Sequence, residues 1–147
     1  MKKRRILNQQ GFSLMEILIA LSLMAIGGTF VVSKLFDRLE SGKRDAAKIQ
    51  ISSFKQLLED YRRYCGQYPS TEQGLDALVA KPTTAPDCPN YPASGFIDGN
   101  KVPKDPWETS YAYETPDGGK TYVITSYASD RKEGGEGNGA DIKSNDL

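Results

Sequence analysis

Acidic side chains and glycines gather near the end of this chain in a pattern that could bind a hard cation. The segment from Ser126 to Ile142 contains four carboxylates and four glycines. Ca²⁺ takes six to eight oxygen ligands at about 2.3–2.6 Å, and glycine lets backbone carbonyls turn toward an ion. The order of the residues is not that of an EF-hand. Composition therefore leaves two interpretations open, a calcium site and a disordered polar segment.

Glu133 and Glu136 in this segment have two further interpretations. Two carboxylates can act as the acid and base of glycoside hydrolysis, or they can form ion pairs between copies of a chain. No pattern in the sequence indicates an aromatic-lined cleft, and the chain has no histidine. Histidine-based catalysis and histidine metal ligands are therefore excluded, and we expect no enzyme activity.

Glu16 is the only charged residue in an apolar run over residues 12–32. A helix of this length spans about 30 Å, the thickness of the hydrocarbon core of a bilayer. A carboxylate in such a helix costs roughly 2.5–3.5 kcal/mol, so a compensating partner is expected. Four cations at residues 2–5 precede the run and predict a cytoplasmic N-terminus, with the rest of the chain outside the cytoplasm.

The apolar run is too long for an ordinary secretory signal, and Glu16 lies where such a signal is uniformly apolar. The bond between Gly11 and Phe12 offers a cleavage site on the cytoplasmic side instead. Cleavage there would remove the basic leader and keep the whole helix in the mature protein. It would also create an α-amine on Phe12, one helical turn from Glu16.

The charge of the chain restricts the kinds of partner that it can bind. The formal net charge is zero, but the leader holds four cations, so the rest of the chain is acidic overall. This argues against a nucleic-acid partner, which requires a basic face.

Cys65 and Cys88 are the two cysteines, and an even count in an exported domain indicates a disulfide. Two free thiols are the alternative.

A single long helix should carry the apolar run into the soluble part. No proline occurs before Pro69, and we expect one helix from about Phe12 to about Tyr64. Its length of about 80 Å is unusual for a globular protein and favours a filament subunit. Apolar residues recur along it at three- and four-residue steps and should face the core of a small head. This stripe consists of Ala47, Ile51, Phe54, Leu58 and Tyr61.

The residues after the helix predict a small head. Ser70 to Gln73 form a capping-box pattern before a short helix at 74–78. Residues 82–106 are rich in proline, glycine and short polar side chains, which predicts a long loop. A short strand is expected near Phe96.

Two segments rich in β-formers, residues 110–115 and 120–127, flank an Asp-Gly-Gly turn at 117–119. They predict an antiparallel hairpin. Alternation places Tyr111 and Tyr113 on one face of the first strand, and Tyr122 and Ile124 on one face of the second. We expect this face to pack against the long helix, and an aromatic binding platform is the alternative. The fold class is therefore α+β.

The sequence around the leader resembles a known processing signal. Lys-Lys-Arg-Arg, followed by Gly11-Phe12-Ser-Leu-Met-Glu16-Ile-Leu, is similar to the class III signal of type IV pilins and type II secretion pseudopilins. The resemblance implies that a membrane prepilin peptidase cuts after Gly11 and N-methylates Phe12. It also implies that Glu16 pairs with the Phe12 amine of a neighbouring subunit, which offsets the burial of both charges.

Two segments of the head resemble the G-type major pseudopilins of type II secretion in particular. Residues 68–75, Tyr-Pro-Ser-Thr-Glu-Gln-Gly-Leu, are similar to that family's Tyr-Pro-Thr-Thr-Glu-Gln-Gly-Leu segment, and Asp105-Pro-Trp107 matches its Asp-Pro-Trp turn. The resemblance implies a type IV pilin-like fold, in which the long N-terminal helix packs on a small antiparallel sheet followed by a calcium-binding loop. The implied parts are a cleaved leader at 1–11, a transmembrane assembly helix at 12–32, an amphipathic stalk helix at 33–64 and a periplasmic head at 65–147.

The resemblance also favours calcium in the acidic loop. G-type pseudopilins hold a structural Ca²⁺ in an Ala-Asp-Gly-x-x-Gly-Gly-x-Gly-x-x-Ala-Asp-Ile loop. Arg131 stands where that family has glycine, and its charge would oppose a divalent cation unless it points outward. The residues at the ligand positions are the side chains of Asp130 and Asp141 and the backbone near Tyr127, Lys132 and Gly139.

The function implied by the resemblance is structural. Subunits would cross the inner membrane once, with the head in the periplasm, and then form a homo-oligomeric helical fibre. Minor pseudopilins and an inner-membrane assembly platform would be further partners. The fibre would drive folded proteins out of the cell by type II secretion. A type IV pilin of a surface fibre for adhesion, motility or DNA uptake is the alternative, and a membrane-tethered binding module is a third interpretation.

Overall fold

The computed structural model describes residues 11–147, without the side chains of residues 29–31. The predicted leader lies outside the described residues, apart from Gly11. The described chain forms two units, one up to Arg38 and one over Leu39–Leu147, and each is considered by itself. The elements are α1 (Leu14–Cys65), β1 (Ala112–Glu114), β2 (Val123–Ser126), β3 (Ile142–Lys143) and the 3₁₀ helices η1 (Leu75–Leu78), η2 (Ala128–Asp130), η3 (Gly137–Gly139) and η4 (Ser144–Asp146).

The long helix α1 matches the predicted helix to within two residues at its start and one at its end. It begins after Ser13, whose carbonyl accepts hydrogen bonds from the backbone N–H groups of Glu16 (2.9 Å) and Ile17 (3.1 Å). The consecutive glycines 27 and 28 do not interrupt it. It ends at Cys65, and Gly66 follows with a φ of 86°, the left-handed conformation that glycine adopts readily at helix C-termini.

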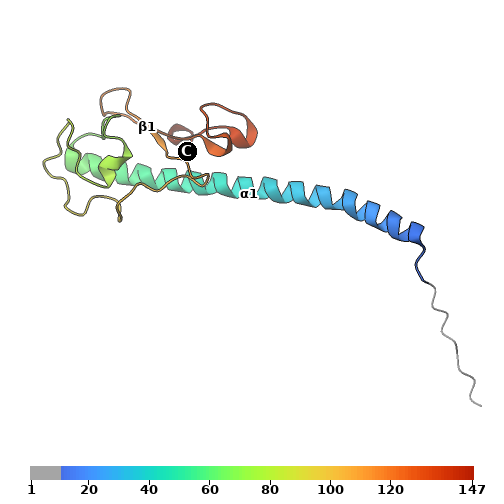
Figure 1. The fold of residues 1–147 in the computed structure, drawn as a ribbon. Coiled ribbons are helices and arrows are strands. Elements are labelled where there is room, and N and C mark those ends of the chain that lie inside the picture. The colour runs from blue at the N-terminus through green and yellow to red at the C-terminus, as the bar shows by residue number, and fades with distance from the viewer. Residues whose placement is uncertain (1–10) are drawn as a thin grey trace, which may run out of the picture. The chain divides into compact units, whose positions relative to one another are not determined.

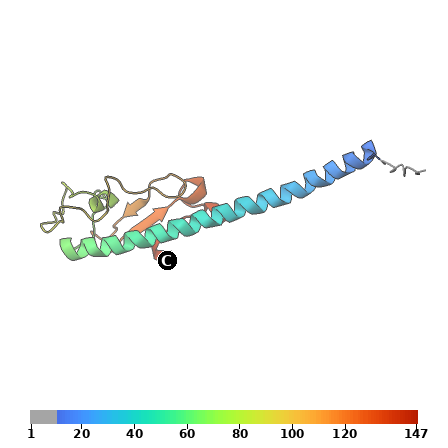
Figure 2. The same ribbon diagram turned by 90° about the horizontal axis from the view of Figure 1, so that it is seen from below.

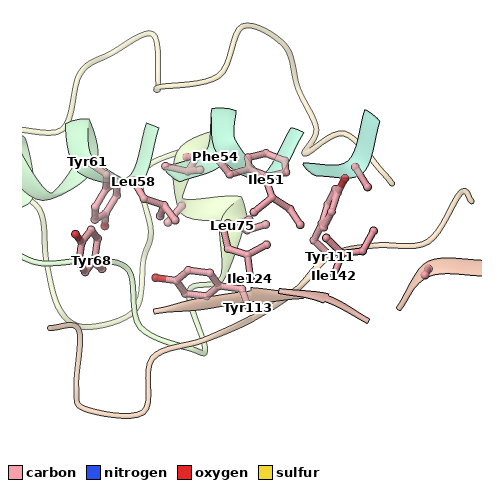
Figure 3. Packing of buried hydrophobic residues seen from close by; sticks show 14 of the residues in the cluster. Ile51, Phe54, Leu58, Tyr61, Tyr68, Leu75, Tyr111, Tyr113, Ile124 and Ile142 are labelled. Atoms are coloured by element: carbon pink, nitrogen blue, oxygen red, sulfur yellow. The ribbon is translucent and has the colours of Figure 1, made fainter. Parts of the chain in front are cut away.

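The apolar stripe of α1 forms one wall of the core, as the periodicity predicts. All five of its residues are at most 2% exposed. Figure 3 shows Ile51, Phe54 and Leu58 directed toward the β-strands. Phe54 contacts Tyr111 edge to face, with ring centroids 5.2 Å apart. The stripe therefore packs on the sheet rather than forming a free partner-binding face.

The sheet has three antiparallel strands in the order β1-β2-β3 and lies along α1 within the second unit (Figure 2). The predicted hairpin is confirmed as β1 and β2, which place Tyr113 opposite Ile124. The third strand, β3, places Ile142 opposite Ser126 and extends the predicted hairpin by one strand. Ile142 is 4% exposed, so this strand carries the chain after the acidic loop back into the core.

Two tyrosines bind the hairpin to other parts of the second unit. The Tyr111 hydroxyl donates to Gln50 Oε1 of α1 at 2.6 Å, and the Tyr113 hydroxyl donates to the Pro69 carbonyl at 2.9 Å. Burial raises the pKa of both hydroxyls. They therefore remain neutral hydrogen-bond donors at physiological pH.

The capping box of the head is present, but it closes a turn rather than an α-helix. The Ser70 N–H donates to Gln73 Oε1 (3.0 Å), and the Gln73 N–H donates to Ser70 Oγ (3.2 Å). The predicted short helix is the 3₁₀ helix η1. Gln73 Nε2 also donates to the carbonyls of Thr84 (2.7 Å) and Pro86 (2.9 Å), so the same side chain holds the long loop in place.

The strand expected near Phe96 is absent from the described residues. The N–H groups of Phe96 and Ile97 both donate to the Leu78 carbonyl, at 2.8 and 3.1 Å. Two consecutive amides that share one carbonyl do not form the ladder of a regular strand, in which alternate residues face a partner strand, and neither residue belongs to a strand. Gly95 beside them has a φ of 71°, which also breaks an extended segment. The prediction of a strand here was wrong.

The predicted disulfide is confirmed. Cys65 and Cys88 are bonded, with their Cα atoms 4.7 Å apart, and no free cysteine remains in the described part of the chain. The bond joins the last residue of α1 to the loop over residues 82–106. This loop therefore has a covalent attachment to the helix in addition to the hydrogen bonds from Gln73.

Candidate functional site

The predicted cleavage bond lies just before α1. Gly11 and Phe12 are outside the helix and exposed, and Phe12 keeps 79% of its surface accessible. Glu16 lies in the first turn of α1 and is exposed. Among residues 11–147 its carboxylate has no ion-pair partner. The bond and the carboxylate are therefore both exposed within the described part of the chain.

The N-terminal part of α1 presents an apolar surface that no other described residue covers. It contains the one described stretch that is long and apolar enough to cross a membrane, with a mean hydropathy of 2.1 and none of it buried. A core helix of a soluble protein would be largely buried, so this stretch is not such a helix. The large exposed apolar residues of this unit are Phe12, Leu14, Met15, Ile17, Leu18, Ile19, Leu21, Leu23, Met24, Ile26, Val32, Leu35 and Phe36.

The acidic loop folds so that two of the predicted donors converge on one glycine. A Cβ atom added at Gly135 would overlap the Gly139 carbonyl oxygen and would lie 2.6 Å from Asp130 Oδ2. Both oxygens are thus within 2.6 Å of a single point, which only the absence of a side chain at Gly135 keeps open. A carboxylate oxygen and a carbonyl oxygen that lie this close together are the kind of ligands that a hard cation prefers.

Asp141 borders the same loop from the other side. Its Oδ2 accepts a hydrogen bond from the Gly134 N–H at 3.1 Å, and its own N–H donates to the Gly134 carbonyl at 3.2 Å. Its Oδ1 is buried and has no hydrogen-bond partner among the described residues. A buried carboxylate oxygen without a partner is costly, and a cation is one group that would satisfy it.

The other predicted residues of this loop contribute less. Lys132 donates its N–H to Asp130 Oδ1 at 3.1 Å, so its backbone orients that carboxylate. Tyr127 is half-buried and precedes η2. Arg131 has a φ of 58°, in the left-handed region that favours glycine, and its side chain is exposed, as is that of Lys132. No group of three or more acidic, histidine or cysteine side chains in metal-binding proximity occurs among the described residues, so carbonyl oxygens would supply many of the ligands.

The Asp-Pro-Trp turn has a buried role that its sequence did not reveal. Asp105 is 2% exposed, and its Oδ1 accepts the N–H groups of Trp107 (3.1 Å) and Thr109 (2.7 Å). Its Oδ2 accepts the Ser126 hydroxyl of β2 at 2.7 Å. The Trp107 indole N–H donates to both carboxylate oxygens of Glu40, at 2.9 and 3.0 Å. The turn therefore connects the sheet to α1.

Arg44 is a second contact between α1 and the loops that the sequence analysis missed. Its Nη1 donates to the carbonyls of Asn138 (3.1 Å) and Ala140 (2.7 Å), and in Figure 1 the loop after β2 lies beside this part of α1. Extending the apolar stripe backward from Ala47 by steps of three and four residues reaches Arg44 and then Glu40. The periodicity thus contained a signal that these two polar residues share the core-facing side of the helix.

Comparison with known proteins identifies the family. Residues 34–145 match the family model described as "Type II secretion system (T2SS), protein G". The chain belongs to the type II secretion protein G family. Residues 6–32 match a second model, the "Prokaryotic N-terminal methylation motif", which covers the predicted cleavage bond and Glu16.

Individual members of the protein G family resemble this chain over nearly all of its length. A "Type II secretion system core protein G" from Vibrio cholerae serotype O1 is 39% identical over 97% of this chain and 94% of that relative. The Pseudomonas aeruginosa protein of the same description is 37% identical, over 91% of this chain and 93% of its own length. A crystal structure of the major pseudopilin of the type 2 secretion system of enterohaemorrhagic Escherichia coli superposes with a TM-score of 0.66 and 32% identity, covering 77% of this chain and 95% of that one.

These comparisons confirm the predicted fold and family together. Protein G chains are structural pseudopilin subunits and not a family of enzymes. The calcium ligands, the pairing of Glu16 and the division into four parts stay predictions.

Proposed function

We propose that this chain is the major structural subunit of the pseudopilus, the periplasmic fibre of a type II secretion system. The proposal rests on one combination of features. The head matches protein G, and an N-terminal methylation motif lies on an apolar helix that no other described residue covers. The motif alone would suit a type IV pilin of a surface fibre equally well. The match of the head to protein G favours the pseudopilus.

Before assembly, the apolar part of α1 crosses the inner membrane once, with the leader in the cytoplasm and the head in the periplasm. A prepilin peptidase then cuts after Gly11 and methylates Phe12, so the chain is the substrate of that enzyme and has no catalytic role of its own. The new amine of one subunit pairs with Glu16 of another as the helices leave the bilayer. The pair removes a cost of roughly 2.5–3.5 kcal/mol for an isolated carboxylate in lipid.

The partners of the chain in this scheme are other copies of itself, the prepilin peptidase, minor pseudopilins and the inner-membrane assembly platform. Nucleic acid is not among them. Crosslinking of intact membranes tests self-assembly. We expect a ladder of bands at multiples of the subunit mass, whereas a single monomer band would favour a membrane-tethered binding module.

We also propose that the acidic loop binds a structural Ca²⁺, which would hold the loop closed by electrostatic attraction to its oxygens. Three observations support the fit. Asp130 Oδ2 and the Gly139 carbonyl converge beside Gly135, Asp141 Oδ1 is buried and unpartnered, and the Arg131 and Lys132 side chains are exposed. The ligands from this chain would be Asp130, Asp141 and nearby backbone carbonyls.

Removal of calcium should lower the stability of the chain. A ligand that binds only the folded state at 100 times its Kd stabilises by about 2.7 kcal/mol. We expect Ca²⁺ to release or take up heat in calorimetry after EDTA treatment and to raise the melting temperature of the detergent-solubilised chain. Mg²⁺ at the same concentration is the control, since it prefers a smaller octahedral site. The absence of both heat and a rise in melting temperature would show that the acidic loop does not bind calcium.

A further inference from the structure

Arg44 on α1 contacts the acidic loop directly. A single guanidinium nitrogen on α1 donates to two carbonyls more than ninety residues away, those of Asn138 and Ala140. These carbonyls belong to the residues on either side of Gly139. The contact is therefore made with the backbone of the loop and not with its carboxylates.

The position of these carbonyls sets the direction of the one between them. Because Arg44 draws the carbonyls of Asn138 and Ala140 toward α1, the backbone on both sides of Gly139 is fixed. The Gly139 carbonyl oxygen lies beside Gly135, close to Asp130 Oδ2. The orientation of a proposed calcium ligand thus depends on a side chain of the helix.

We propose that Arg44 is a positioning residue for the cation loop and that it couples occupancy of this loop to the order of α1 around residues 40–48. The inference rests on the calcium site proposed above. Coupling between two sites is reciprocal, so a cation that orders the loop should also stabilise the helix at Arg44. The chemistry of the ligand is that of a hard divalent cation, for which Ca²⁺ is the probe.

The direction in which calcium affinity changes when Arg44 is removed distinguishes a positioning role from simple electrostatic repulsion. Arg44 is a cation near a cation site, so Coulomb's law alone predicts that its removal strengthens calcium binding. Positioning predicts the opposite, because a misoriented Gly139 carbonyl no longer reaches the ion. Loss of a group that orients a metal ligand typically weakens metal binding by about 10–100-fold.

The test uses the full chain in detergent micelles and compares four proteins. These are the wild type, Arg44→Gln, Arg44→Lys and the control Lys48→Gln, which removes a cation from an exposed site on the same helix. Calorimetric titration with Ca²⁺ after EDTA gives each dissociation constant. We expect Arg44→Gln to bind at least about tenfold more weakly. Arg44→Lys should lie between the two because an ammonium lacks the planar fork of arginine, and Lys48→Gln should bind no more weakly than the wild type.

Hydrogen exchange measured with and without Ca²⁺ supplies a second readout. In the wild type, Ca²⁺ should slow exchange both in the loop over residues 130–141 and in α1 around Arg44. In Arg44→Gln, the protection should be confined to the loop. If Arg44→Gln does not fold, the same comparison is made with Arg44→Lys.

The outcomes separate this inference from the calcium proposal. Equal or tighter binding by the Arg44 variants, with helix protection unchanged, would overturn the positioning role and leave the calcium site intact. A wild type that binds no Ca²⁺ would overturn the calcium site and this inference with it.

Discussion

Replacing Glu16 with alanine should abolish fibre assembly while leaving the chain inserted in the membrane and cleaved. Glu16 lies in the first turn of α1 on an uncovered apolar helix, and the Phe12 amine of a neighbour is its proposed partner. Removing one member of a buried ion pair costs about 3–5 kcal/mol because the other charge is left uncompensated. This is a loss of roughly 100-fold or more in the association constant of each subunit.

Electron microscopy of isolated fibres and mass spectrometry of the membrane-bound chain measure the two parts of this prediction. The mature mass should correspond to N-methylated Phe12 in both the wild type and Glu16→Ala. Ser22→Ala is a matched control, since the Ser22 hydroxyl donates to the Leu18 carbonyl of the same helix at 2.8 Å and so needs no partner. It should assemble normally. Fibres of Glu16→Ala at wild-type abundance would refute the role of this carboxylate.

Replacing Gly135 with alanine should remove calcium binding and destabilise the head, whereas the same change at Gly134 should have a much smaller effect. Both glycines have positive φ angles, 83° and 98°, so both substitutions strain the backbone by about 1–2 kcal/mol. Only at Gly135 does the new Cβ meet the Gly139 carbonyl and Asp130 Oδ2. A Cβ atom added at Gly134 would have no atom within 4 Å apart from those of its chain neighbours.

Comparing the two variants therefore separates the effect of filling the space beside Gly135 from the effect of losing the conformational freedom of glycine. We expect Gly135→Ala to lose a further 1–3 kcal/mol from overpacking, together with the heat of calcium binding. Urea unfolding with and without Ca²⁺ measures both effects. Gly134→Ala should keep its response to calcium. If Gly135→Ala binds Ca²⁺ as tightly as Gly134→Ala does, the oxygens around Gly135 do not form the site.

The parts of the fold that repeat locally could be predicted from the sequence. The steps of three and four residues from Ala47 to Tyr61 located the buried face of α1, because a helix returns side chains to one face at that interval. The hairpin followed from alternation and an Asp-Gly-Gly turn. The disulfide followed from two cysteines in an exported head, although composition did not exclude free thiols.

The parts that depend on distant residues could not be predicted. The periodicity places Glu40 and Arg44 on the core-facing side of α1, but only the fold shows that Glu40 accepts from Trp107 and that Arg44 donates to Ala140. The buried carboxylate of Asp105 needs a hydroxyl from β2 to complete its hydrogen bonds. The strand expected near Phe96 is absent because the amides of Phe96 and Ile97 donate to the carbonyl of Leu78, the last residue of η1, a contact that no local pattern reveals.

The acidic loop shows the same division between composition and arrangement. Its carboxylates and glycines indicated calcium chemistry, but they could not distinguish an ordered site from a polar tail. The structure orders the loop through Arg44, the Gly134–Asp141 hydrogen bonds and β3. The loop is ordered by its contacts with the helix and the sheet, so its conformation could not be predicted from its own residues.

Deletion of the gene in its own host tests whether the chain is the pseudopilus subunit of type II secretion. The quantity to measure is the ratio of a folded secreted enzyme in the medium to the same enzyme in the periplasm, with surface fibres counted in parallel. We expect the enzyme to accumulate in the periplasm and surface fibres to persist, and we expect the wild-type gene to restore secretion while Glu16→Ala does not. Unchanged secretion together with loss of surface fibres would show instead that the chain is a pilin.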